Sequence, residues 1–289
     1  MAVLLTGGLA AKTSVRIAQF LQEAKIPCLL ASRRGDAAAS APNFPAIKFD
    51  WVDQTTYASP FAYSFPGGEG IEAVYMIMPR VPQPEKHINA FVDFAAARGV
   101  RRFVLMAGTT ASLGGPGPGQ VWKHMVEKGV EWCVCRPTWF MENLSQDFHF
   151  KPLKEEGRIY TCAGDGKISL VSAEDISAVA FHALTDEKPP NTDYRIVGPA
   201  TMTHDELAEK LAEILGRKIT HVNLTPEERT KHLAEQLGYP APYAGFLAML
   251  EKLAAQGVEN YLDDTVLKIT GRPPMSIETF AQKHKAIWE

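Results

Sequence analysis

Short apolar segments alternate with amphipathic ones through the first half of the chain, and this alternation restricts the fold more than any other feature. Each apolar segment spans four to six residues, and several are almost wholly apolar, as strands buried on both faces of a parallel sheet must be. The intervening segments repeat apolar residues at three- and four-residue spacing, which predicts helices packed on that sheet. We expect strands at 3–6, 28–31, 46–49, 73–78, 103–107 and 131–135, and helices at 13–24, 85–98 and 121–128.

This order predicts an α/β fold with a doubly wound parallel sheet, because strand–helix–strand connections of this kind form right-handed crossovers. Beyond residue 150 the pattern loosens, with helices expected at 174–184, 203–215 and 226–237 and a strand at 218–222. Thr203 and Glu206 have the spacing of a capping box, which marks a helix start. We expect a core at 1–150 and a small C-terminal α/β lobe at 151–289, with one sheet element of the lobe returning to the core.

Composition and charge exclude several classes of protein. The 289 residues are 46% hydrophobic and 22% charged, which is typical of a compact globular chain. The formal net charge is -3 and the basic residues are scattered, so we expect no nucleic-acid partner. The apolar runs are too short for a membrane helix, and the N-terminus has no secretory leader pattern. The expected location is cytoplasmic.

The cysteines and histidines carry no metal or disulfide signature. The eight histidines lack HxxxH or His–Cys spacing, so no metal site is predicted. Two of the four cysteines alternate along a predicted strand and are interpreted as small core residues. The cysteines are Cys28, Cys133, Cys135 and Cys162.

The first turn, TGGLAAKTS at 6–14, follows a strand and opens a helix. Backbone amides and the helix dipole hold a dinucleotide pyrophosphate at this place in a Rossmann fold. A full fingerprint would also have glycine at Ala10 and Thr13, so the turn is poor in glycine. One ammonium group and two hydroxyl groups are expected to compensate by donating to phosphate oxygens. The residues assigned to the pyrophosphate are Gly7, Gly8, Lys12, Thr13 and Ser14.

The end of the second strand indicates which dinucleotide binds. NAD-specific proteins place an acidic residue there for the ribose 2′-hydroxyl, whereas this chain has Ser32, Arg33 and Arg34. Two guanidinium groups suit a 2′-phosphate. The sequence therefore predicts an NADP(H)-binding Rossmann core that favours NADP(H) over NAD(H).

Two further segments complete the predicted cofactor site. Asp50 and Trp51 follow the third strand, where they are placed to meet the adenine, with the carboxylate accepting from its amino group. Met78 ends the fourth predicted strand and Pro79 follows it, and both are expected to line the side of the nicotinamide ribose.

A catalytic tyrosine is missing. Short-chain dehydrogenases usually place Ser or Thr after the fifth strand and a YxxxK motif on the next helix, where the tyrosine protonates a carbonyl oxygen. Thr109 can serve as the first element, but no tyrosine lies between Tyr75 and Tyr160. Trp122 and Lys123 occupy that helix instead, and Lys123 is only a weak candidate for a donor.

The missing acid suits one kind of acceptor. An iminium already carries a positive charge, so hydride addition gives a neutral amine and no proton is needed. Catalysis would then depend on holding the acceptor carbon against the nicotinamide in a near-attack geometry, which can lower the reaction barrier by about 7 to 11 kcal/mol. A glycine- and proline-rich run at 114–119 leaves the carboxyl edge of the predicted sheet, where ligands bind in this fold, although a simple spacer is the competing interpretation.

A resemblance to a known family agrees with this reading. The segment RPTWFMEN at 136–143 resembles the RPxxFMxN segment of NmrA-like proteins, the atypical branch of short-chain dehydrogenases. Within that branch the chain is most similar to fungal ergot-alkaloid enzymes of the festuclavine and agroclavine dehydrogenase type. The similar stretches are TGGLAAKTS, RRFVLMAGTT, RPTWFMENLS, IYTCAGDGKISLVSAEDI, HALTDEKPPNTDYRIVGP, LGRKITHVNLTPEE and TGRPP.

The resemblance implies an oxidoreductase that uses NAD(P)H to reduce a cyclic iminium, formed from chanoclavine-I aldehyde, to festuclavine or agroclavine. A cationic, indole-fused substrate calls for aromatic surface, and Glu142 is a candidate to balance its charge. Thr138 is assigned to the cofactor. The residues assigned to the substrate are Thr109, Trp122, Trp139, Phe140 and Phe148.

Two other functions stay open at this point. One is a non-catalytic NmrA-like redox sensor that binds NADP(H) and signals through a protein partner. The other is an isoflavone-reductase-like enzyme acting on another small molecule, for which Lys123 is the obvious base. On the leading hypothesis the partner is a small alkaloid, and the protein is a monomer or a homodimer.

Overall fold

The computed structural model describes residues 1–8, 11–35 and 44–289. The chain divides into two compact units, and each is described by itself. Unit 1 comprises Met1–Pro137 and Ala173–Ile196, and unit 2 comprises Thr138–Ser172 and Val197–Glu289.

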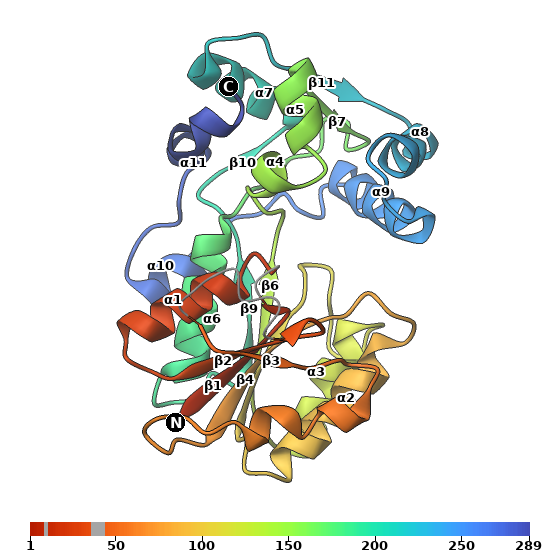
Figure 1. The fold of residues 1–289 in the computed structure, drawn as a ribbon. Coiled ribbons are helices and arrows are strands. Elements are labelled where there is room, and N and C mark those ends of the chain that lie inside the picture. The colour runs from red at the N-terminus through yellow and green to blue at the C-terminus, as the bar shows by residue number, and fades with distance from the viewer. Residues whose placement is uncertain (9–10, 36–43) are drawn as a thin grey trace. The chain divides into compact units, whose positions relative to one another are not determined.

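Unit 1 is built on a seven-stranded parallel sheet with the strand order β3-β2-β1-β4-β5-β6-β9 (Figure 1). The observed α/β architecture confirms the predicted fold class. The strands are β1 (Ala2–Thr6), β2 (Cys28–Ser32), β3 (Ala46–Lys48), β4 (Ile71–Ile77), β5 (Arg102–Met106), β6 (Glu131–Pro137) and β9 (Thr192–Ile196). The helices are α1 (Ser14–Glu23), α2 (Pro84–Ala96), α3 (Pro118–Lys128) and α6 (Ala173–Thr185), with 3-10 turns η3 (Gln54–Thr56) and η4 (Ser59–Ala62).

Successive side chains of each strand point to opposite faces of the sheet, so each strand contributes to two cores. Leu4, Val74 and Phe103 belong to the core that also contains Phe91 of α2 and Met125 of α3. On the other face, α6 packs against α1 and against strands β4, β5 and β6. Figure 1 shows α2 with α3 on one side of this sheet and α1 with α6 on the other. Helices on both faces explain why the strands read as nearly continuous apolar runs.

The edge strand β9 lies in a segment where the sequence pattern predicted no strand. It pairs with β6 in parallel register, Cys133 opposite Thr192 and Pro137 opposite Ile196. Four of its five residues are at least partly exposed, and its sequence TDYRI is largely polar. An edge strand buries less surface than a central one, so it does not need the apolar run by which the other strands were recognised.

Unit 2 contains two small sheets and a set of helices. β8 (Ile168–Ser169) pairs antiparallel with β10 (Thr201–Met202), and β7 (Arg158–Thr161) pairs in parallel with β11 (Thr220–Asn223). The helical elements are α4 (Asn143–Gln146), α5 (Phe150–Glu156), α7 (His204–Leu215), α8 (Pro226–Lys231), η5 (His232–Gln236), α9 (Ala241–Ala255), α10 (Thr265–Thr270), α11 (Ile277–His284) and η6 (Lys285–Ile287).

The predicted capping box is present at the start of α7. The Thr203 hydroxyl accepts from the Glu206 amide at 3.1 Å, and the Glu206 carboxylate accepts from the Thr203 amide at 2.8 Å. The expected helix at 226–237 is two elements, because α8 ends at Lys231 and continues as the π-helical turn η5.

Within residues 1–8, 11–35 and 44–289, no helix is both long enough and apolar enough to cross a membrane. The same residues contain no group of three or more His, Cys, Asp or Glu arranged to hold a metal ion.

Candidate cofactor site and the residues around it

The turn after β1 requires two glycines. Gly7 and Gly8 have φ angles of +87° and +58°, a region that L side chains rarely adopt. A Cβ atom on Gly8 would lie 2.6 Å from the Cβ of Ser32 at the end of β2. The turn therefore passes against the second strand with no room for a side chain. Ala10, one of the two positions where the fingerprint has glycine and this chain does not, lies outside the described residues, as does Leu9.

Two hydroxyl groups at the end of the turn are directed into unit 1. The Ser14 hydroxyl donates to the Thr6 carbonyl at 2.7 Å, and the Thr13 hydroxyl accepts from the Tyr75 hydroxyl at 2.9 Å. Both Thr13 and Ser14 are buried. These side chains support the turn from beneath, and their predicted hydrogen bonds to phosphate stay predictions. Lys12, the third residue predicted to donate to phosphate, is half-buried.

A cavity of about 350 Å³ opens at the carboxyl ends of β1 to β4. Parallel strands present their carboxyl ends at one edge, and this is where doubly wound sheets bind their ligands. The structure brings eight of the residues predicted for the cofactor into the wall of this cavity. They are Gly7, Ser32, Arg33, Arg34, Asp50, Trp51, Met78 and Pro79.

The chemistry of the cavity wall fits a phosphorylated nucleotide. Arg33 and Arg34 are exposed, so their guanidinium groups stay hydrated until a ligand arrives. The Ser32 hydroxyl oxygen is buried and has no hydrogen-bond partner among the described residues. A buried polar atom in a ligand cavity is satisfied when the ligand supplies the partner. The wall thus offers two cations and a hydroxyl group at the predicted ribose position.

Asp50 and Trp51 are held by packing as well as by hydrogen bonds. The Asp50 amide donates to the Thr56 hydroxyl at 2.9 Å, which fixes the segment after β3. The Trp51 ring lies edge-on to Phe49, with ring centroids 4.9 Å apart, and is largely buried. Little of the Trp51 side chain is therefore left exposed where it lines the cavity.

Thr109 accepts a hydrogen bond through its backbone carbonyl, whereas Trp122 is buried in the core. The Thr109 carbonyl accepts from the Arg136 guanidinium at 2.7 Å, which ties the end of β5 to β6. Trp122 is buried in the core beside Trp132, with ring centroids 5.9 Å apart. The Arg136 guanidinium carbon lies 5.8 Å from the centroid of the Trp122 ring. The face of Trp122 is thus engaged by protein groups, and its predicted contact with substrate stays a prediction.

Lys123 is exposed on α3. Its ammonium group lies 3.6 Å from the Glu127 carboxylate one turn along the same helix, and both side chains are more than half exposed. An exposed pair of this kind is hydrated and only weakly coupled. The geometry resembles an ordinary solvated helix face more than a catalytic acid.

The remaining predicted residues lie in unit 2. The Thr138 hydroxyl is buried and donates to the Glu259 carboxylate at 2.9 Å. Trp139 and Phe140 are half-buried and line a small chamber of about 10 Å³, which is too small for an alkaloid. Phe148 is buried, and its ring lies edge-on to Trp139 at 6.2 Å. Glu142 is also buried.

Comparison with known proteins places the chain. No family model matches it. Festuclavine synthase II of Penicillium roqueforti is 37% identical over 290 residues, which cover 100% of both chains. Agroclavine dehydrogenase of Claviceps fusiformis is 37% identical over 291 residues, which cover 100% of this chain and 99% of that one. The chain belongs to the festuclavine and agroclavine dehydrogenase family.

Membership of the festuclavine and agroclavine dehydrogenase family makes the chain an oxidoreductase, as the sequence predicted. The same fold also occurs in proteins of much lower sequence identity. The crystal structure of Citrobacter sp. triphenylmethane reductase complexed with NADP(H) matches with a TM-score of 0.79 at 19% identity, covering 98% of this chain and 99% of that chain. At that identity the match shows the fold alone, and it is the fold on which the cavity at the ends of β1 to β4 is built.

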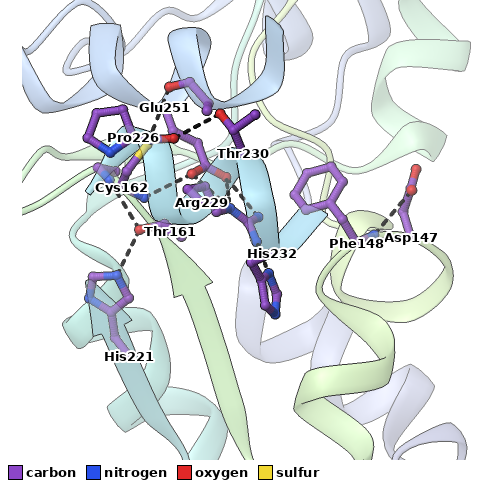
Figure 2. Close-up of polar contacts among 12 residues, drawn as sticks. Asp147, Phe148, Thr161, Cys162, His221, Pro226, Arg229, Thr230, His232 and Glu251 are labelled. Atoms are coloured by element: carbon purple, nitrogen blue, oxygen red, sulfur yellow. Dashed lines mark hydrogen bonds and ion pairs between the residues drawn. The ribbon is translucent and has the colours of Figure 1, made fainter. Parts of the chain in front are cut away.

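In this member of the dehydrogenase family, unit 2 contains a buried ion pair that the sequence did not reveal (Figure 2). The Arg229 Nε–H of α8 is shared between both oxygens of the Glu251 carboxylate of α9, each at 3.1 Å, and Nη2 donates to the same carboxylate at 2.9 Å. Neither side chain is appreciably exposed. Glu251 also accepts from the Cys162 amide at 2.9 Å. Arg229 follows a capping box on a short polar helix, and such a position ordinarily indicates a solvated cation.

Two buried histidines share the small chamber of unit 2. His149 and His204 both line it, with ring centroids 6.3 Å apart. Burial lowers the pKa of His149 well below its usual value, and the charge of Arg229 lowers it further. Burial also lowers the pKa of His204 to about 3. Both rings are therefore neutral at pH 7. The sequence contains no local signal for this cluster because its members come from different elements.

Proposed function

We propose that this chain is an NADP(H)-dependent reductase that converts a cyclic iminium, formed from chanoclavine-I aldehyde, into festuclavine or agroclavine. The observation that carries the proposal is the full-length identity of 37% to a festuclavine synthase and to an agroclavine dehydrogenase. Because the match covers essentially the whole of each chain, it includes both units and not only a shared nucleotide-binding core.

The cavity of unit 1 supplies residues for the cofactor. Gly7 and Gly8 let the backbone approach a pyrophosphate closely. Arg33 and Arg34 would pair with a 2′-phosphate, and the Ser32 hydroxyl would bond the same phosphate or the ribose. When bound, the reduced nicotinamide supplies the hydride. The arginine pair is what favours NADP(H) over NAD(H).

The residues at the usual acid position support an iminium acceptor. Trp122 stands in the core and Lys123 pairs with Glu127 in solvent, so this part of α3 presents no group suited to protonating an oxyanion. Hydride addition to a C=N⁺ carbon moves the π electrons onto nitrogen and cancels its charge, which completes the reaction without a proton. The protein then needs only to hold the acceptor carbon in place.

Unit 2 is proposed to supply the substrate surface. Trp139 and Phe140 are half-buried, so part of each residue stays accessible. Aromatic faces attract a cationic ring system by about 0.5 to 2 kcal/mol for each good contact. Phe148, packed edge-on against Trp139, is assigned the supporting role of fixing that ring.

The deciding experiment follows NADPH oxidation by the purified full chain with three kinds of acceptor: a preformed cyclic ergoline iminium, chanoclavine-I aldehyde, and simple ketones or enones. Turnover of the iminium but not of ketones is the expected result, and product analysis then names the alkaloid. Lys123→Gln is the control variant, and its rate should stay within about two-fold because an exposed ion pair contributes little.

Two other outcomes would replace the proposal. Tight NADPH binding with no turnover of any acceptor would leave a redox sensor. Turnover of enones that is abolished in the Lys123→Gln variant would indicate an isoflavone-reductase-like enzyme with a lysine base.

A further inference from the structure

Thr13 occupies the position where a dinucleotide-binding fingerprint has its last glycine. That glycine normally allows the helix to pack closely on the strands beneath it. In this chain a side chain must be accommodated there, and the Thr13 hydroxyl makes no capping bond to α1. It accepts instead from the hydroxyl of Tyr75, which projects from β4, at 2.9 Å.

A network of buried hydrogen bonds surrounds this contact. The Ser177 hydroxyl of α6 donates to the Ala173 carbonyl of its own helix at 2.6 Å and lies 3.2 Å from the Thr13 carbonyl. The Ser14 hydroxyl donates to the Thr6 carbonyl at 2.7 Å, and the Thr6 hydroxyl accepts from the Ile77 amide at 2.9 Å. Four elements of unit 1, namely β1, α1, β4 and α6, therefore meet beneath the turn through polar groups.

The turn itself lies directly against β4. A Cβ atom on Gly7 would lie 3.0 Å from Cδ1 of Ile77, two residues after Tyr75 on the same strand. A small displacement of β4 relative to α1 would therefore move the glycine backbone. Buried polar groups hold their partners firmly, because an unsatisfied hydroxyl inside the protein is costly.

We propose that Tyr75 is a positioning residue for the cofactor: its hydrogen bond to Thr13 sets the start of α1 against β4 and so performs the packing role of the missing glycine. This inference rests on the proposed cofactor site and not on the proposed substrate. Tyr75 itself is fully buried and does not contact the ligand cavity. Because Tyr75 does not line that cavity, it does not replace the absent proton donor, and burial, which raises the pKa of its phenol well above the usual value, keeps it neutral.

The test compares two substitutions at one position. Thr13→Ser keeps the hydroxyl group, and Thr13→Val keeps the shape but removes it. We expect NADPH binding by Thr13→Ser to stay close to that of the parent chain. Thr13→Val and Tyr75→Phe should each raise the Kd by about three- to ten-fold, the effect of losing one buried hydrogen bond. The Kd is measured by titration of the full chain without substrate.

The double variant Tyr75→Phe/Thr13→Val should bind NADPH no more weakly than either single variant, because both remove the same bond. Ser169→Ala is the matched control, since it removes another buried hydroxyl bond, to the Gly198 carbonyl in unit 2. It should lower Tm without changing the Kd for NADPH. Tyr75→Phe is the deciding variant, because the Thr13 hydroxyl is also predicted to donate to phosphate and Tyr75 is not; the phenyl ring keeps the core filled, so this variant is expected to fold.

A fall in Tm with an unchanged Kd in both Thr13→Val and Tyr75→Phe would overturn the inference, since the bond would then stabilise the fold and nothing else. Losses that multiply in the double variant would also overturn it. Steady-state rates add a second readout: positioning of the cofactor predicts a higher KM for NADPH with little change in kcat. Failure of the iminium assay would leave these binding results intact and would count against the proposed substrate alone.

Discussion

At the scale of single residues, the cofactor cavity depends on what stands at the carboxyl ends of four strands. Arg33 and Arg34 follow β2, and Asp50 with Trp51 follows β3. These residues could be predicted from local sequence because the carboxyl ends of parallel strands always lie at the same edge of the sheet. Thr13 and Ser14 were nominated on the same basis, yet their hydroxyls turn inward to Tyr75 and the Thr6 carbonyl.

The arginine pair gives a prediction about cofactor choice. Replacing both Arg33 and Arg34 by Ala should weaken NADPH binding by about ten-fold or more, because charge-assisted bonds to a phosphate are lost. NADH lacks that phosphate, so its Kd should change by less than about two-fold. Titration with each nucleotide measures the two constants. Equal losses for both would remove the assignment of the 2′-phosphate to this pair.

At the scale of elements, strands and helices were recognised where burial acts over several residues in sequence. β1, β4 and β5 are almost wholly buried and read as apolar runs. β9 is an edge strand of mixed polarity and gave no such pattern. α7 was recognised from its capping box, a purely local device, and its first turn forms as expected.

The capping box of α7 gives a prediction about stability. Thr203→Ala removes the acceptor for the Glu206 amide and should lower the free energy of unfolding by about 1 kcal/mol. Thr203→Ser retains the hydroxyl group and should lower the free energy of unfolding by only about 0.3 kcal/mol. Urea unfolding of the two variants and the parent chain measures the difference. A similar loss for Ser and Ala would show that the methyl group, rather than the capping bond, stabilises this turn.

At the scale of the whole molecule, unit 2 is held by groups brought together from separate elements. Arg229 and Glu251 are 22 residues apart, and His149 and His204 are 55 residues apart in the two different chain segments that form the unit. The His221 and His204 ring centroids are 5.3 Å apart, and Nδ1 of His221 lies 3.3 Å from the Asp205 carboxylate. His232 bonds Arg229 at 3.0 Å (Figure 2). Because His149 and His204 are neutral, they add no charge to a region that already contains the buried arginine.

The buried histidines predict how stability depends on pH. Their pKa values are lower in the folded protein than in the unfolded chain, so the unfolded chain binds more protons as pH falls. Above about pH 6.5 these histidines do not reduce the free energy of unfolding. As the pH falls from there toward 3, that free energy declines by about 1.4 kcal/mol per pH unit for each histidine that stays neutral in the folded protein. His204→Phe should reduce that slope, as measured by urea unfolding at several pH values. An unchanged slope would mean that other groups control it.

The sequence by itself determined the parallel sheet, the glycine turn, the arginine pair and the absence of a tyrosine on α3. Each of these depends on residues close together in the chain or on the shared edge of a parallel sheet. The tertiary structure alone decided that Trp122 lies in the core, that Thr13 bonds Tyr75, and that Arg229 is buried against Glu251. Those contacts join residues far apart in sequence, and burial of a polar or aromatic side chain is set by all the elements that surround it.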